Sequence, residues 1–254
     1  MILQIEALTF SYNKEKVLKN INLEAEKGEL ITLIGPNGSG KSTLLKCINN
    51  YLKADQGTIK VKDKKINYFT KKELAKIIAY VPQASEINFN LDVFETILMG
   101  RKAYSGWKAS QQDKEITAEV ISKMGLEEIA FKNINKLSGG QQQKVFIARA
   151  AAQTAELILL DEPTNNLDLK HQLEIFELIE KEVNMGKTVI VTMHDLSLVS
   201  RFSDRIIMLK EGSIYSDCTA ANLSAAKINS VYGVEVSLKE HNGKKIIIPE
   251  KICV

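Results

Sequence analysis

The sequence predicts an α/β protein, with a parallel sheet, an antiparallel β-subdomain beside it and an inserted helical subdomain. Within the first ninety residues, short β-rich runs alternate with turn residues, a pattern that favours antiparallel strands. Residues 84–153 instead repeat apolar side chains at helical spacing. Beyond residue 155, continuous apolar runs alternate with a helical pattern. This indicates that the parallel sheet resumes after the insertion.

The N-terminal strands are predicted at residues 3–8 and 17–25, because both runs are β-rich and lie next to the turn residues of 13–16 and 27–28. The run ELITLIG that follows is mostly apolar, as expected of a strand buried on both faces. A helix is predicted directly after the glycine-rich loop that ends this strand. Its apolar residues recur at helical spacing and are Leu44, Leu45, Ile48 and Leu52.

The same two periods predict the later elements. Helical patterns occupy residues 94–100, 111–126 and 141–153. Buried strands are predicted at residues 156–163, 188–194 and 205–212. A helix at 167–183 separates the first two strands, and its apolar stripe comprises Leu169, Leu173, Phe176, Ile179 and Val183. The tail at 231–249 is predicted to be a hairpin turned at Asn242 and Gly243.

Composition is that of a globular protein, with 44% hydrophobic and 26% charged residues among 254. The formal net charge of +3 gives no electrostatic footprint for nucleic acid, so no direct nucleic-acid partner is expected. The lysine-rich stretch 60–72 is interpreted as a solvated surface. The three cysteines lack metal-ligand spacing, which is typical of reduced thiols in a cytosolic protein.

No apolar run approaches the length of about 20 residues that spans a bilayer. The N-terminus also has no basic segment followed by an apolar core, so no signal peptide is expected. If the protein takes part in transport, other polypeptides must therefore supply the transmembrane path.

The first chemical motif is GPNGSGKST at residues 35–43, which fits the phosphate-binding pattern G-x-x-x-x-G-K-[ST]. Its glycines allow successive backbone N–H groups to point at a triphosphate, at the N-terminus of the following helix. Lys41 is expected to contact the β- and γ-phosphates, and Ser42 to ligate Mg²⁺. The candidate nucleotide-binding residues here are Gly35, Pro36, Asn37, Gly38, Ser39, Gly40, Lys41, Ser42 and Thr43. By itself this motif leaves GTPases and kinases open.

A pair of carboxylates, Asp161 and Glu162, follows the predicted buried strand LILL. Ligand chemistry in α/β sheets is located at such strand ends. Because adjacent residues point in different directions, Asp161 is expected to reach Mg²⁺ while Glu162 polarises the attacking water. The alternative is that two acids cap the next segment.

These residues, together with LSGGQ at 137–141, resemble the ATP-binding subunits of ABC transporters, over nearly the whole chain up to about Leu223. The resemblance implies a P-loop NTPase (RecA-like) core. In that family the LSGGQ signature of one subunit closes over the γ-phosphate held by its partner. The signature residues implied to bind ATP in trans are Ser138, Gly139, Gly140 and Gln141. A serine and two glycines at a helix N-terminus also form an open anion site.

Four further positions match landmarks of that family. Tyr12 matches the aromatic residue that stacks on adenine, although a strand tyrosine that fills a sheet face is the alternative. Gln83 matches the switch glutamine that senses Mg²⁺ and water, and His194 the switch histidine on the γ-phosphate. Asp168 marks the loop that crosses the dimer interface. The implied catalytic residues are Glu162, His194 and Gln83, and the implied Mg²⁺ ligands are Ser42, Gln83 and Asp161.

The resemblance also implies an assembly. A head-to-tail homodimer would hold two ATP molecules and dock on two transmembrane permease subunits, near Gln83 and residues 89–101, with a substrate-binding protein involved indirectly. The chain would lie peripherally at the cytoplasmic face of the cell membrane. A single ATP-binding domain is expected at 1–240, with a RecA-like and β part at 1–84 and 156–223 and a helical subdomain at 85–155; residues 224–254 would form a short C-terminal extension.

Three segments narrow the resemblance to importers of iron-siderophore, haem and cobalamin: FNLDVFETILMGR, DEPTNNLD and HDLSLVSRFSDRIIMLKEGSI. Zinc or manganese importers are the nearest alternative. A soluble ABC ATPase that serves iron-sulfur assembly is a further one. DNA-repair members carry a long coiled coil for which residues 84–136 leave no room, and translation members carry two cassettes.

Overall fold

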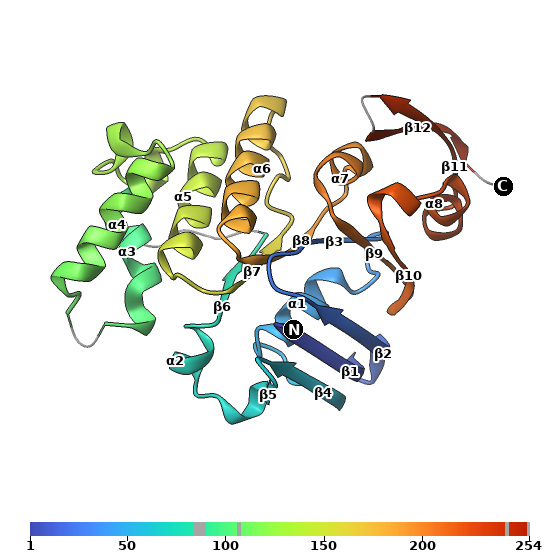
Figure 1. Ribbon diagram of the computed structural model, residues 1–254, viewed down its shortest axis with the longest axis horizontal. Coiled ribbons are helices and arrows are strands. Elements are labelled where there is room, and N and C mark those ends of the chain that lie inside the picture. Colours follow the sequence, from blue (N-terminus) through green and yellow to red (C-terminus); the bar gives the residue numbers. More distant parts are fainter. Residues whose placement is uncertain (84–89, 106–107, 242–243, 253–254) are drawn as a thin grey trace.

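The computed structural model describes residues 1–83, 90–105, 108–241 and 244–252. Figure 1 shows the central sheet between a group of helices at one end and the C-terminal hairpin at the other. This sheet has six strands in the order β10-β9-β3-β8-β7-β6. All neighbouring strands are parallel except β10, which is antiparallel to β9. The strands are β3 (Leu30–Ile34), β6 (Ile78–Val81), β7 (Leu157–Asp161), β8 (Thr188–Thr192), β9 (Arg205–Lys210) and β10 (Ser213–Thr219).

A second sheet contains the N-terminal strands in the antiparallel order β2-β1-β4-β5. Its strands are β1 (Leu3–Tyr12), β2 (Glu15–Ala25), β4 (Gln56–Val61) and β5 (Lys64–Lys65). The short helices η1 (Ile66–Tyr68) and α2 (Lys71–Leu74) lead from this sheet to β6. The antiparallel β-subdomain predicted from the sequence is therefore present.

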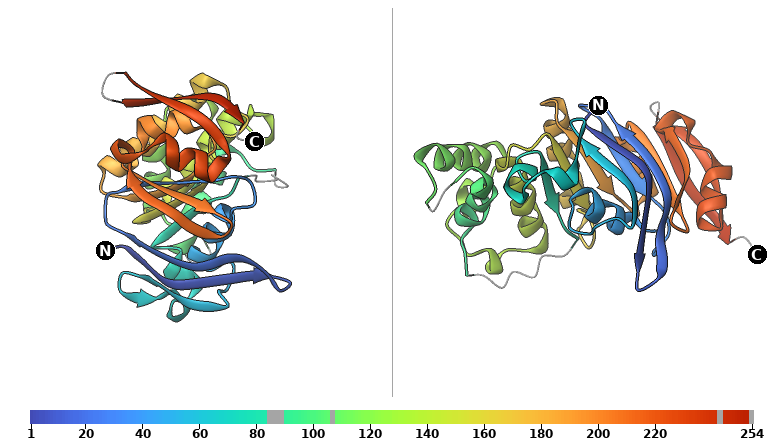
Figure 2. Two further views of the ribbon diagram at one scale, coloured as in Figure 1. Left: turned by 90° about the vertical axis from the view of Figure 1, so that its right-hand side faces the viewer. Right: turned by 90° about the horizontal axis from the view of Figure 1, so that it is seen from below.

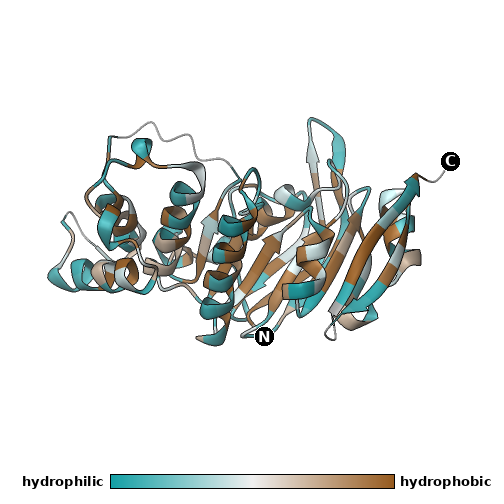
Figure 3. Cartoon of the chain, turned by 90° about the horizontal axis from the view of Figure 1, so that it is seen from above, coloured by the Kyte–Doolittle hydropathy of each residue, from teal (hydrophilic) through white to brown (hydrophobic). Residues whose placement is uncertain are grey.

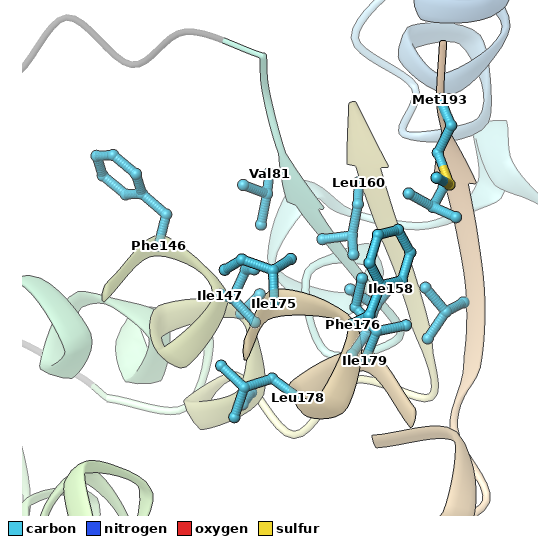
Figure 4. Packing of buried hydrophobic residues seen from close by; sticks show 14 of the residues in the cluster. Val81, Phe146, Ile147, Ile158, Leu160, Ile175, Phe176, Leu178, Ile179 and Met193 are labelled. Atoms are coloured by element: carbon cyan, nitrogen blue, oxygen red, sulfur yellow. The ribbon is translucent and has the colours of Figure 1, made fainter. Parts of the chain in front are cut away.

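The two faces of the central sheet belong to two separate hydrophobic clusters. Successive strand residues point to opposite faces, so Leu157 and Leu159 pack toward helix α1 (Lys41–Ile48) and the N-terminal sheet, and Ile158 and Leu160 pack on the other side. Figure 4 shows Ile158 and Leu160 facing the apolar side chains of helix α6 (Leu169–Asn184). In Figure 3, hydrophobic residues concentrate on the strands. Fully covered strands explain the continuous apolar runs in the sequence.

Helices cover the second face and form the insertion. The longest are α4 (Gln111–Lys123), α5 (Gly139–Ala152) and α6 (Leu169–Asn184). Figure 2 shows the green helices of the insertion grouped beyond one edge of the sheet. The shorter helices are α3 (Val93–Leu98), η2 (Met99–Ala103), η3 (Glu127–Ile129), η4 (Ile134–Lys136), α7 (Leu196–Phe202), η5 (Ala220–Asn222) and α8 (Ala225–Tyr232).

Two sequence predictions need comment. The predicted apolar stripe of α6 is wrong at Leu169, which is 68% exposed, because the helix begins at this residue and its first turn extends beyond the core. Phe176 and Ile179 of the predicted stripe are buried, and Ile175, Leu178 and Glu182 are buried with them. The tail hairpin is present as the antiparallel strands β11 (Val234–His241) and β12 (Lys244–Ile252). Its predicted turn at 242–243 lies outside the described residues, as does Phe89 of the expected docking stretch.

Candidate nucleotide-binding site

The glycine-rich loop connects the end of β3 to the start of α1. Gly40 precedes the helix with a φ of +103°, and a Cβ there would lie 2.8 Å from Leu18 Cδ2. An L side chain is therefore excluded by both the backbone conformation and the space. Lys41 is buried, and its Nζ donates to the carbonyl oxygens of Gly35 at 2.7 Å and Pro36 at 3.1 Å. The loop is thus wrapped around a lysine ammonium group.

Burial lowers the pKa of Lys41, while the carboxylates of Glu162 and Asp161 act in the opposite direction. A buried cation is costly unless negative charge lies nearby. The phosphates of a nucleotide would supply such charge at the place where the loop carbonyls now serve as partners.

Asp161 ends β7 and is 2% exposed. Its Oδ1 accepts from Ser42 Oγ at 2.9 Å and from Thr192 Oγ1 at 2.8 Å, and its Oδ2 accepts from Tyr80 Oη at 3.3 Å. Burial, followed by the charge of Asp161, raises the pKa of Tyr80, so the phenol remains a donor. The Ser42 hydroxyl and the Asp161 carboxylate, predicted as Mg²⁺ ligands, are in direct contact. Both are the hard oxygen donors that Mg²⁺ prefers, so this donor set fits the ion.

Glu162 has a φ of +49°, a region that residues other than glycine seldom occupy. Its N–H donates to Thr192 Oγ1 at 2.8 Å. Its carboxylate is hydrogen-bonded to Gln83 Nε2 and to His194 Nε2, and it accepts from Asn165 Nδ2 at 3.2 Å. The three residues predicted to be catalytic therefore meet at one carboxylate. Backbone strain of this kind is concentrated at functional sites.

A hollow of about 340 Å³ lies over the loop. Among the described residues, its lining comprises Tyr12, Glu15, Val17, Asn37, Gly38, Gly40, Lys41, Ser42, Thr43 and Glu162. Tyr12 is 43% exposed and meets the Phe10 ring edge-on at a centroid distance of 4.8 Å. Its ring is therefore placed where it could stack on a base. Four larger hollows among the described residues, of about 540, 580, 420 and 350 Å³, are lined by neither the glycine loop nor the strand-end carboxylates.

The LSGGQ segment forms the N-terminus of α5. Ser138 caps the helix: its Oγ accepts from Gln141 N at 3.4 Å, and Gln141 Oε1 accepts from Ser138 N at 3.2 Å. Ser138 and Gly139 are exposed, so the positive end of the helix dipole faces outward. None of the signature residues lines the hollow over the phosphate loop, nor does Asp168. The signature segment and the phosphate loop of one chain therefore do not share a hollow.

Asp168 caps α6 and is linked to His171. Its Oδ1 accepts from His171 N at 2.9 Å and pairs with His171 Nδ1 at 2.8 Å. The hydrogen bonds from the amide and then from the ring lower the pKa of Asp168. The His171 ring also covers Gly140, where a Cβ would lie 2.6 Å from Cδ2. The structure therefore joins the signature helix to the Asp168 loop through a histidine to which the sequence assigned no role.

Sequence reasoning missed Thr192, Tyr80, Asn165 and His171 at this site. Thr192 and Tyr80 lie in strands whose sequences are otherwise apolar, so the sequence pattern gives no sign of their hydrogen bonds to Asp161. The spacing of Asp168 and His171, three residues apart, was a usable signal, because a cap residue accepts from the third residue of its helix. The sequence leaves open whether Trp107 lies at a partner interface or covers the helical subdomain, and this residue lies outside the described residues.

A phosphate loop facing a strand-end Asp-Glu pair defines a nucleotide-hydrolysing P-loop protein. The model of the ABC transporter family matches residues 18–165, so the chain belongs to this family. An uncharacterized ABC transporter ATP-binding protein of Methanocaldococcus jannaschii is 44% identical over 98% of both chains. The petrobactin import ATP-binding protein of Bacillus subtilis is 34% identical over 96% of this chain and 98% of its own. A manganese transport system ATP-binding protein of Halalkalibacterium halodurans is 36% identical, with coverages of 98% and 96%.

Solved structures of ABC transporter proteins are also similar to this chain. A structure described as a metal-chelate type ABC transporter in an inward-facing conformation matches with a TM-score of 0.86 and 26% identity, over 98% of this chain and 97% of that one. A dimeric ATP-binding cassette bound to ADP and phosphate matches with a TM-score of 0.76 and 34% identity, over 86% and 99%. This protein is therefore an ATP-hydrolysing subunit of an ABC transporter. None of its described helices is long and apolar enough to cross a bilayer.

Proposed function

We propose that this chain drives import of a metal chelate, of the iron-siderophore, haem or cobalamin class, through separate membrane subunits. The observation that supports it is the set of relatives: those named for petrobactin import, iron(3+)-hydroxamate import and, as probable, iron chelatin transport are 32–38% identical. The relative named for manganese transport is 36% identical, so a manganese importer is the second candidate. An iron-sulfur assembly role gains no support from these relatives.

The hydrolytic mechanism follows from the hydrogen bonds of Glu162. In this proposal its carboxylate orients the attacking water as a general base, while Gln83 and His194 hold the carboxylate in place. Lys41 exchanges its loop carbonyl partners for the β- and γ-phosphates. Ser42 and Asp161, with Gln83, would hold Mg²⁺, which supplies neutralisation of the charge that develops on the phosphates. Tyr12 would stack on adenine.

The proposed assembly is a head-to-tail homodimer, because the signature and phosphate loop of one chain do not line a common hollow. In a C2 arrangement the exposed N-terminus of α5 would close over the γ-phosphate held by the partner, with Ser138, Gly139, Gly140 and Gln141 as donors and Asp168 at the interface. Within each chain of the proposed dimer, the helical subdomain comprises residues 85–155. The RecA-like and β parts comprise 1–84 and 156–223, and the C-terminal extension comprises 224–254.

Two permease subunits would dock near Gln83 and the helix α3, at the cytoplasmic face of the membrane, with a substrate-binding protein acting on their far side. ATP-driven closure of the dimer would then move the permeases, and hydrolysis would reopen it.

The import proposal is tested with the subunit reconstituted in vesicles with its permease and binding protein. Uptake of labelled ferric siderophore, haem, cobalamin and Mn²⁺ is measured with ATP inside. We expect ATP-dependent uptake of one of the chelates and none with a Lys41→Ala subunit. Uptake of Mn²⁺ alone would reject the proposal in favour of the second candidate.

A further inference from the structure

We propose that Tyr232, in the C-terminal extension, is a positioning residue for the phosphate loop. The Gly35 N–H, at the first residue of the loop, donates to Tyr232 Oη at 2.8 Å, across 197 positions of sequence. The extension would thus form part of the support of the nucleotide site. The inference rests on the assignment of residues 35–43 as the phosphate loop.

The Tyr232 hydroxyl is held in place by helix α8. The helix packs into the main core through Ile228 and Val231, which are 0% and 4% exposed. Lys210, at the end of β9, donates from Nζ to Ser230 O at 2.8 Å. Because β9 is the parallel neighbour of β3, α8 is fastened beside the strand that leads into the loop.

The Tyr232 hydroxyl keeps one protonation state at physiological pH. Burial is the main cause that raises the pKa of Tyr232 to about 12. The hydroxyl therefore remains protonated at physiological pH, and its oxygen accepts the Gly35 N–H as a neutral phenol. A buried N–H without an acceptor is unfavourable, so the contact stabilises this placement of the Gly35 amide.

Gly35 needs such an anchor because its other polar group changes partner. Its carbonyl accepts from Lys41 Nζ at 2.7 Å, and in the proposed binding mode Lys41 exchanges this oxygen for the phosphates. Its backbone is also confined, since a Cβ would lie 2.2 Å from Leu209 O and 2.7 Å from Ser39 Oγ. When Lys41 binds the phosphates of ATP, the hydrogen bond that the Gly35 N–H donates to Tyr232 Oη still holds the first residue of the loop.

The extension also packs on helix α7 through strand β12. Strand β12 lies along α7, and the buried hydroxyl of Ser200 in that helix donates to Lys245 O. Lys245 Nζ in turn donates to Leu223 O at 2.7 Å. Figure 1 shows α7, α8 and β12 together at one end of the molecule. Because α7 begins two residues after His194, the same extension supports both the loop and the histidine segment.

Tyr232→Phe tests the proposal, because it removes only the hydroxyl. Tyr215→Phe is the matched control, since Tyr215 lies on the neighbouring strand β10 and is 47% exposed. We expect Tyr232→Phe to raise the Kd and the KM for ATP about fivefold, the range of one net hydrogen bond, with kcat within about twofold. The control should match the wild type in all three.

A structural role alone would lower the urea midpoint of Tyr232→Phe and leave the Kd for ATP unchanged, and that result would overturn the proposal. If the variant fails to fold, amide exchange of Gly35 in the wild type decides. Slow exchange with and without ATP supports the anchor, and fast exchange in either state rejects it. Lys41→Ala distinguishes a failure of the phosphate-loop assignment from a failure of the Tyr232 proposal. If Lys41→Ala abolishes ATP binding while Tyr232→Phe changes nothing, the phosphate-loop assignment is supported and the role of Tyr232 is rejected.

Discussion

The substitution Glu162→Gln tests the catalytic assignment most directly. The carboxylate is hydrogen-bonded to Gln83 and His194 and accepts from Asn165 Nδ2 at 3.2 Å. A glutamine has almost the same shape, and its amide oxygen can keep the bonds from Gln83 and Asn165 while its NH₂ group turns to His194 Nε2, which accepts in one tautomer. Folding and the phosphate loop should therefore be unaffected.

The substitution Glu162→Gln removes the basicity of the side chain. General-base catalysis contributes about 10²–10⁴-fold, which corresponds to about 3–5 kcal/mol of barrier. We expect kcat to fall by that factor. The Kd for ATP should stay equal or decrease, because the substitution removes one negative charge beside the phosphate site, where Glu162 and Lys41 interact.

The assay is steady-state phosphate release with and without the permease, together with size-exclusion chromatography in ATP. ATP without turnover should trap a dimer, whereas the wild type should return to monomers as ATP is consumed. Glu180→Gln, on the exposed side of α6, is the matched control and should retain full activity. Undiminished phosphate release by Glu162→Gln would refute the role of Glu162 as the base.

Two other substitutions test the loop and the signature helix. Lys41→Ala should weaken ATP binding at least tenfold, since a charge-assisted bond contributes about 1.5–3 kcal/mol, while Lys46→Ala in the same helix should not; equal affinities by titration would contradict the assignment. Gly140→Ala places a methyl group against His171, 2.6 Å from Cδ2, and should lower the free energy of unfolding by about 1–3 kcal/mol and reduce ATPase activity. Gly139→Ala, with nothing within 4 Å, is its control, and equal urea midpoints for the two would count against the contact.

Much of the fold was predictable because its signals are local. The buried strands leave continuous apolar runs, and the helices leave a period near 3.6, so the α/β core, the antiparallel strands and the helical insertion could be predicted. Leu169 shows the limit of such patterns. Its position fits the apolar stripe of α6, yet it is exposed, because the place where a helix leaves the core is decided by its neighbours.

The phosphate loop and the LSGGQ segment were determined by the sequence itself, because short runs of glycine, serine and lysine decide where backbone N–H groups point. Only the tertiary structure decided their surroundings. The strand order β3-β8-β7 places Thr192 of β8 beside Asp161 of β7, and the packing of α8 brings Tyr232 to Gly35. Contacts between residues this far apart depend on strand order and helix packing, and the local periodicity of a chain carries no record of either.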